Sequence, residues 1–203
     1  MNQTAQKVES APLVDETYYA AVTEAIRNEA TRLLREGAVA AVIGYVAGRR
    51  AGTALPAVVT TPERTAELIF SPACRNNLSL YLTKAKQDAV PTGRLAIIVK
   101  GCDLRALVGL LGESQIKREN LHIIGIACAG VFAANADQSL PLSETTIAKK
   151  CRECTVQLPA EVDFTAGTLP TLPRLTPVEA EELARLEALT PAERWAFWKE
   201  QFS

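Results

Sequence analysis

The chain has 203 residues, of which 48% are hydrophobic, and a formal net charge of -1 from 22 basic and 23 acidic side chains. This length and apolar share are typical of a globular protein with one sizeable core, and the balanced charge argues against nucleic-acid binding. No apolar stretch approaches the roughly 20 residues that a membrane span needs, and the polar N-terminal residues lack the apolar core of a signal peptide. We therefore expect a soluble, cytoplasmic protein.

The first half of the chain predicts helices and strands in alternation. Apolar residues at helical spacing predict a helix over 16–35, which ends at Gly37. A strand within 38–48 follows, and then a strand over 57–60 leads into a helix that begins at Thr61-Pro62. The stretch 72–86 predicts a further helix, with Cys74 in its first turn.

Two further strands are expected at 93–101 and 120–130, with a helix over 103–116 between them. Continuous apolar strands that alternate with amphipathic helices are typical of a parallel sheet with helices on both faces. The predicted fold class is therefore α/β, with a Rossmann- or flavodoxin-like parallel sheet and a C-terminal helical extension.

Beyond residue 130 the pattern becomes irregular. We expect a loop over 133–144, a short helix or turn over 144–155, a proline-rich surface linker over 158–177, and two helices over 176–189 and 190–202. The predicted organisation is an N-terminal helix over 1–36, an α/β domain over 37–155 that carries all five cysteines, and a linker with partner-docking helices over 156–203.

Four of the five cysteines form a pattern that predicts a shared site. Cys102 follows the strand at 93–101, and Cys128 follows the apolar run of the next strand. If these strands are neighbours in a parallel sheet, both thiols lie at the same rim, where the functional groups of such sheets gather. Cys151 and Cys154 form a CxxC pair, whose spacing lets two thiolates face one metal centre.

The odd number of cysteines favours metal or redox chemistry over a disulfide framework, and the single histidine, His122, makes the site thiolate-rich. Spacing alone does not separate zinc from an iron–sulfur cluster. Lys149, Lys150 and Arg152 surround the CxxC pair and are expected to lower the pKa of its thiols. Cys74 is an alternative ligand, a reactive thiol or a packed side chain. Cys128 by itself has the alternative of a small buried apolar residue.

The segments "AIIVKGCDLRAL", "IIGIACAG" and "KKCRECT", in this order, resemble the beta-subunit family of deazaflavin-coenzyme-reducing hydrogenases and dehydrogenases. This family includes formate dehydrogenase beta subunits and heterodisulfide-reductase-linked electron carriers. The resemblance extends over residues 38–155. It implies a 4Fe-4S cluster bound by four cysteines: Cys102, Cys128, Cys151 and Cys154.

The resemblance also allows a flavin, such as FAD, beside the cluster. It implies partners within a redox complex: ferredoxin-like, flavin-binding or heterodisulfide-reductase-type chains. The chain ends at Ser203 without the ferredoxin-like cysteines of longer relatives, so we expect a form without that module.

Three residues next to Cys102 are candidates for cofactor binding: Lys100, Asp103 and Arg105. A helix cap and a surface arginine are the alternatives for Asp103 and Arg105. The glycines of "IGYVAGRRAG" lack the tight turn of a dinucleotide-binding fingerprint, although Arg49 and Arg50 would favour an anionic cofactor. His122 is interpreted as structural. The aromatic residues of the last helix, which include Trp195 and Trp198, either dock on the core or face a partner.

The predicted function is an iron–sulfur electron-transfer subunit of an anaerobic oxidoreductase complex. The alternative is a zinc-stapled, non-catalytic scaffold or adaptor subunit. A third interpretation is a metal-free, thiol-reactive enzyme that uses Cys74 or the CxxC pair. The lone histidine argues against a histidine-based catalytic triad, and no P-loop motif is present in the sequence, so we do not expect a hydrolase.

Overall fold

The computed structural model describes residues 11–83, 88, 90–169, 171–173, 175 and 180–202. The described residues fall into two compact units, one that extends to Pro173 and one that contains the last two helices. All four cysteines of the predicted site belong to the first unit.

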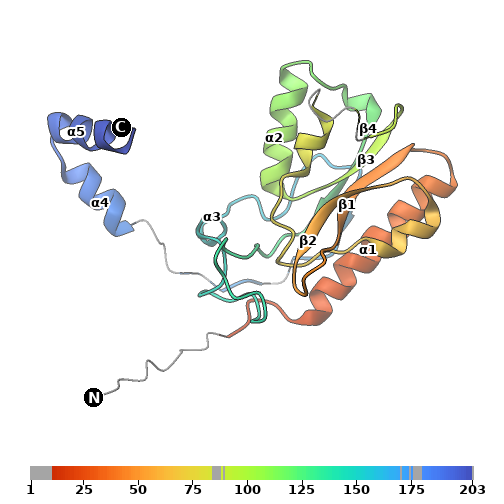
Figure 1. Ribbon diagram of the computed structural model, residues 1–203, viewed down its shortest axis with the longest axis horizontal. Helices are drawn as coiled ribbons and strands as arrows, with labels where there is room; N and C mark the ends of the chain where they lie inside the picture. Colours follow the sequence, from red (N-terminus) through yellow and green to blue (C-terminus); the bar gives the residue numbers. More distant parts are fainter. Residues whose placement is uncertain are drawn as a thin grey trace. The chain divides into compact units, whose positions relative to one another are not determined.

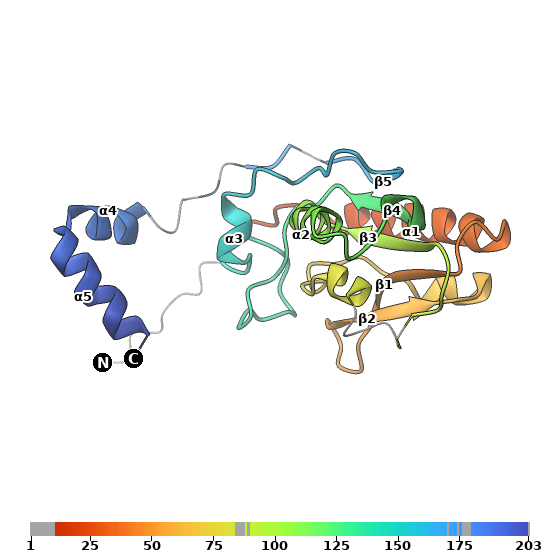
Figure 2. The same ribbon diagram turned by 90° about the horizontal axis from the view of Figure 1, so that it is seen from above.

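The first unit is built on a five-stranded sheet, which confirms the predicted α/β class (Figure 1). Figure 2 shows the strands in the order β2-β1-β3-β4-β5. Strands β1, β3, β4 and β5 are parallel to one another, and β3 and β4 are buried along their whole length. The strands are β1 (Ala41–Ala47), β2 (Ala54–Val59), β3 (Leu95–Val99), β4 (Leu121–Ile126) and β5 (Phe164–Ala166).

Strand β2 is antiparallel to β1, so the sheet is mostly parallel, with one antiparallel strand at this edge. The connection over 48–53 is too short for the crossover that a parallel pair needs, and it forms a hairpin instead. Gly52 adopts a positive φ of 75° in this turn, and the Gly48 N–H donates to the Thr53 carbonyl at 2.8 Å. The glycine pattern of this stretch therefore belongs to a hairpin.

Two long helices cover opposite sides of the sheet (Figure 1). Helix α1 (Glu16–Arg35) begins at Asp15, whose carboxylate accepts from the Tyr18 N–H at 3.0 Å, and Gly37 follows its end with a φ of 64°. This confirms the predicted helix. Its buried apolar residues recur at helical spacing and face β1 and β5: Val22, Ile26, Ala30 and Leu33. Helix α2 (Gly101–Gly112) packs on β3 from the other side.

Of the two helices predicted between β2 and β3, the first begins at Thr61-Pro62 as predicted but is a short 3-10 helix, and the second begins later than predicted and is also a 3-10 helix. Residues Pro62–Glu67 form the 3-10 helix η1, and Leu78–Leu82 form the 3-10 helix η2; part of the second predicted helix lies outside the described residues. The Asn77 side chain accepts from the Ser79 N–H at 2.9 Å and starts η2 there. Cys74 therefore lies in a turn before η2 and not in the first turn of an α-helix.

The predicted linker over 158–177 contributes β5, a short fifth strand parallel to β4. The Asp163 carboxylate, just before β5, accepts from the Ile123 N–H at 2.7 Å and from Arg118 Nη2 at 2.9 Å. Proline-rich sequence concealed this strand, because three paired residues are too few for a clear alternating pattern.

The second unit contains α4 (Ala180–Ala188) and α5 (Pro191–Gln201). Thr190 and Glu193 form a reciprocal capping box at the start of α5, as the Thr-Pro step predicts. Among the described residues, no helix is long and apolar enough to cross a membrane.

Candidate functional site

The carboxyl ends of β3 and β4 bring Cys102 and Cys128 to one edge of the sheet. The two strands are adjacent and parallel, with Leu95 opposite Leu121 and Val99 opposite Gly125. Cys102 lies in the first turn of α2, directly after β3, and Cys128 lies two residues after β4. This register confirms the predicted shared rim.

The CxxC pair reaches the same rim through the short helix α3 (Lys149–Arg152) and the residues around it. The Ala148 N–H donates to the Val131 carbonyl, and the Cys128 N–H donates to the Gln157 carbonyl, both at 2.8 Å. The loop after β4 is thus joined to residues on both sides of the CxxC pair. Gly130 has a φ of 121°, and a Cβ there would lie 2.7 Å from Ile147 Cδ1, so another residue would strain the backbone and displace the Ile147 side chain.

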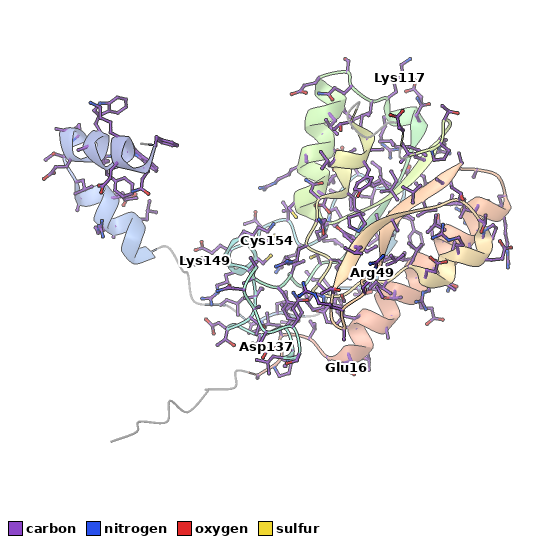
Figure 3. The ribbon with its side chains drawn as sticks, viewed as in Figure 1. Glu16, Arg49, Lys117, Asp137, Lys149 and Cys154 are labelled. Carbon is purple, nitrogen blue, oxygen red and sulfur yellow. The ribbon has the colours of Figure 1, made fainter. Side chains whose placement is uncertain are left out.

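Cys102, Cys128, Cys151 and Cys154 line one small cavity, which we call the cysteine cavity. Figure 3 marks Lys149 and Cys154 at the α3 side of this region. The cavity volume is about 20 Å³, and its wall is almost wholly apolar. Besides the four cysteines, the lining residues are Lys100, Gly101, Gly130, Val131, Lys150, Val156 and Gln157.

Close contact between α2 and the residues after the CxxC pair closes one side of the cysteine cavity. A Cβ at position 101 would lie 1.7 Å from the Val156 carbonyl oxygen, which is an impossible contact with rigid backbone. Glycine is therefore required at the start of α2 by this close approach.

Burial dominates the ionisation of the thiols in the cysteine cavity. Burial raises the pKa of Cys128 to about 12, and it also raises the pKa of Cys102 and of Cys151. Lys150 acts in the opposite direction on Cys102 and Cys151, but its effect is smaller than that of burial. The predicted net lowering of thiol pKa by the basic neighbours is therefore wrong for Cys151 without a metal.

Lys100 is a buried cation at the wall of the cysteine cavity, with 3% of its side chain exposed. Its Nζ lies 2.8 Å from Asp103 Oδ2 and donates to the Tyr45 hydroxyl at 2.5 Å and to the Asn76 carbonyl at 3.0 Å. The Tyr45 hydroxyl in turn donates to the same Asn76 carbonyl. Sequence reasoning missed Tyr45 and Asn76, because a tyrosine within an apolar strand and an asparagine within a loop carry no motif.

Two other candidate residues lie outside the wall of the cysteine cavity. Cys74 is fully buried, and its Sγ accepts from the Ser71 N–H at 3.4 Å; burial raises its pKa to about 11. Arg105 is exposed on α2. Neither residue is among those that line the cavity.

An open groove of about 340 Å³ adjoins the cysteine cavity and shares Val131 and Lys150 with it. Arg75 and Lys150 give this groove two basic side chains, and Phe132 gives it an aromatic surface. Its volume is within the range of small-molecule sites, and its basic side chains suit an anionic ligand.

The donor set of the cysteine cavity fits a thiolate-bound metal centre. Its potential ligands are four soft sulfur atoms, without a lining carboxylate or imidazole. A metal–sulfur bond of about 2.3 Å is much shorter than a van der Waals contact, so a group bonded to these thiols needs less free space than an unbonded ligand. Within the described ranges, no three histidine, cysteine, aspartate or glutamate side chains converge to hold a single metal ion.

No known protein-family profile matches the chain. Part of the chain is 33% identical over 99 residues to the F420-dependent formate dehydrogenase 1 subunit beta of Methanococcus maripaludis, which is 48% of this chain and 24% of that protein. The match thus spans about a quarter of the relative's length.

A chain of the F420-reducing NiFe hydrogenase complex from Methanosarcina barkeri, in a xenon-derivatised structure, superposes with a TM-score of 0.43 and 16% identity. The superposition covers 57% of this chain and 38% of that one, and its TM-score is too low to establish a common fold. The sequence comparison supports the resemblance at a coarse level: this chain is similar to a subunit of an F420-dependent oxidoreductase.

Proposed function

We propose that the chain is an electron-transfer subunit of an oxidoreductase complex and that it holds a 4Fe-4S cluster through Cys102, Cys128, Cys151 and Cys154. The observation that carries this proposal is the single cavity that these four cysteines line, although they come from three separate segments of the chain. Similarity to a formate dehydrogenase beta subunit supports the redox role.

The spacing of the sulfur atoms favours a cluster over the alternative of structural zinc. A single zinc ion needs four sulfurs within about 3.8 Å of one another, as bonds of about 2.3 Å in a tetrahedron dictate. No such convergence is present among the described side chains, whereas a cluster takes one thiolate at each of four separate iron atoms. A cluster supplies one-electron transfer; the chain's own residues bind it, exclude water from it and set its electrostatic surroundings.

A flavin is the second part of this proposal. The groove beside the cysteine cavity offers Arg75 and Lys150 to a phosphate and Phe132 to an aromatic ring system. A flavin bound there would lie next to the cluster, because the groove and the cavity share two wall residues. The presence of the groove supports FAD binding but carries less weight than the four cysteines.

The test is metal and flavin analysis of anaerobically purified protein, combined with single cysteine variants. We expect a brown protein with about four iron and four sulfide ions per chain. Cys102→Ala, Cys128→Ala, Cys151→Ala and Cys154→Ala should each lose most of the iron.

Cys74→Ala is the matched control and should keep the iron, because Cys74 does not line the cavity. A colourless protein with one zinc per chain would overturn the electron-transfer proposal in favour of a zinc-stapled adaptor. A metal-free protein whose CxxC thiols alkylate rapidly would instead favour a thiol-reactive enzyme. Flavin in the same preparation is counted from its own absorbance.

A further inference from the structure

The ammonium group of Lys100, the residue after β3, has three polar partners. It is held by a carboxylate, a phenol and a backbone carbonyl at 2.5–3.0 Å, and Tyr45 and Asp103 are themselves buried. Asp103 also caps α2, since its Oδ2 accepts from the Lys100 N–H at 3.2 Å. The cation is thus fixed in position at the wall of the cysteine cavity.

Stability alone does not explain a buried ion pair at this place. Removing both charges from water is unfavourable by several kcal/mol per ion, and an apolar pair of similar volume is often as stable or more stable. Lys100 lines the cysteine cavity, whose wall is almost wholly apolar, while its ammonium group is held by groups outside that wall. The fixed positive charge beside the four cysteines therefore calls for a functional explanation.

The two charges of the pair lie differently about the cavity. Lys100 is one of the residues that line the cysteine cavity, and Asp103 is not. The Asp103 carboxylate lies beside Cys102, with its Oδ1 3.8 Å from Cys102 Sγ. The lysine side chain is thus part of the cavity wall, whereas Asp103 holds it from outside that wall.

The first turn of α2 adds to the same field. Gly101 and Cys102 are the first residues of a helix of 12 residues, whose amino end carries a partial positive charge. Lys100 and this helix end lie on the same side of the cavity, since Lys100, Gly101 and Cys102 all line it.

We propose that Lys100 is the positioning residue that sets the charge of the cysteine cavity, so that a four-thiolate centre and one added electron are both stabilised there. This inference rests on the proposed function. Four thiolates around a 4Fe-4S core with two positive charges give a net charge of two minus, and one-electron reduction makes it three minus. A fixed cation nearby therefore stabilises the reduced form more than the oxidised form and raises the reduction potential. Asp103 holds Lys100 in place and opposes it in sign.

The experiment is a redox titration of the full chain with dithionite, followed by visible absorbance and by electron paramagnetic resonance. Lys100→Met should lower the midpoint potential, so that the oxidised-to-reduced ratio at a fixed potential rises about tenfold, or about 59 mV for a one-electron couple. Asp103→Asn should shift the potential in the opposite direction. Lys100→Arg, which keeps the charge, should stay near the wild-type value.

Lys117→Met is the control, because Lys117 is exposed and lies at the far end of α2 from Cys154 (Figure 3). Its potential should equal that of the wild type. Equal downward shifts in Lys100→Met and Asp103→Asn would show that the pair has only a structural role and would overturn the inference. An unchanged or higher potential in Lys100→Met would also overturn it.

If Lys100→Met binds no iron, the charge-retaining Lys100→Arg decides: recovery of iron supports the inference, and failure to recover it overturns it. A wild-type protein without iron overturns the proposed function and this inference together. A wild-type protein with iron but without these shifts overturns the inference alone.

Discussion

At the scale of single residues, the position of each cysteine relative to the sheet shows which cysteines line the cavity, and the neighbouring residues in the sequence do not show this as clearly. Cys102 and Cys128 follow adjacent parallel strands and line the cysteine cavity. Cys74 follows Pro72-Ala73 and is buried, and its thiol contacts Ser71. The sequence alone left Cys74 open as a ligand, a reactive thiol or a packed side chain, and its surroundings favour packing.

Alkylation of the metal-free protein should distinguish Cys74 from Cys102. A pKa of about 11 leaves about one thousandth of the Cys74 thiol ionised at pH 8, and the side chain is fully buried. We therefore expect iodoacetamide to label the exposed Cys102 first at pH 8. Labelling of Cys74 should increase about tenfold per pH unit as the pH rises toward 11, because the thiolate is the reactive form. Peptide mass spectrometry measures both rates, and equal rates at pH 8 would contradict this expectation.

At the scale of secondary-structure elements, α2 is the element that shapes the site. It begins two residues earlier than the sequence indicates, at Gly101, and so carries Cys102 within its first turn. Its first residue lies against the Val156 backbone, which couples the helix start to the segment after the CxxC pair. Because Gly101 has no side chain, the start of α2, which carries Cys102, can lie directly against the segment that follows Cys151 and Cys154.

Gly101→Ala should destabilise the first unit by about 1–3 kcal/mol, as overpacking of a buried contact does. The iron content should fall as well, because the Cβ would force α2 and Val156 apart. Gly109→Ala is the matched control on the same helix: no atom lies within 4 Å of its Cβ, and alanine favours helix by about 0.5–1 kcal/mol. Urea unfolding and iron analysis test both variants. A Gly101→Ala protein with wild-type stability and iron content would refute this role of Gly101.

At the scale of the whole molecule, the described residues divide between a unit that contains the cysteine cavity and a unit that contains α4 and α5. In the second unit, Trp195 is 65% exposed and Phe202 is 84% exposed, while Trp198 contacts Phe197 and Phe202 within a small aromatic group. Within this unit the rings form an apolar surface, and both interpretations, docking on the core and facing a partner, remain predictions.

Tryptophan fluorescence provides a test, because both tryptophans of the chain lie on α5. If the rings face a partner, the isolated chain should show red-shifted emission that acrylamide quenches almost as strongly as that of a free indole. Trp195→Ala and Trp198→Ala should change the free energy of unfolding of the first unit by less than about 0.5 kcal/mol, as substitutions at exposed sites do. The iron content should not change. Blue-shifted, protected emission would mean that these rings are covered in the isolated chain.

The sequence by itself determined the α/β class, the long first helix, the strands on which Cys102 and Cys128 depend, and the capped last helix. These features follow from local physics: apolar periodicity, cap residues and Thr-Pro steps act over a few neighbouring positions. The shared rim also followed, because parallel strands place their carboxyl ends together.

Only the tertiary structure decided the antiparallel β2, the short β5 and the 3-10 helices between β2 and β3, because local patterns there are too short or too ambiguous. It also decided which cysteines line one cavity and which residues hold Lys100. Tyr45 and Asn76 come from distant parts of the chain and meet at Lys100 through packing of the sheet. Such contacts, and the burial that raises the thiol pKa values, arise between residues that are far apart in the sequence. No local sequence pattern therefore predicts them.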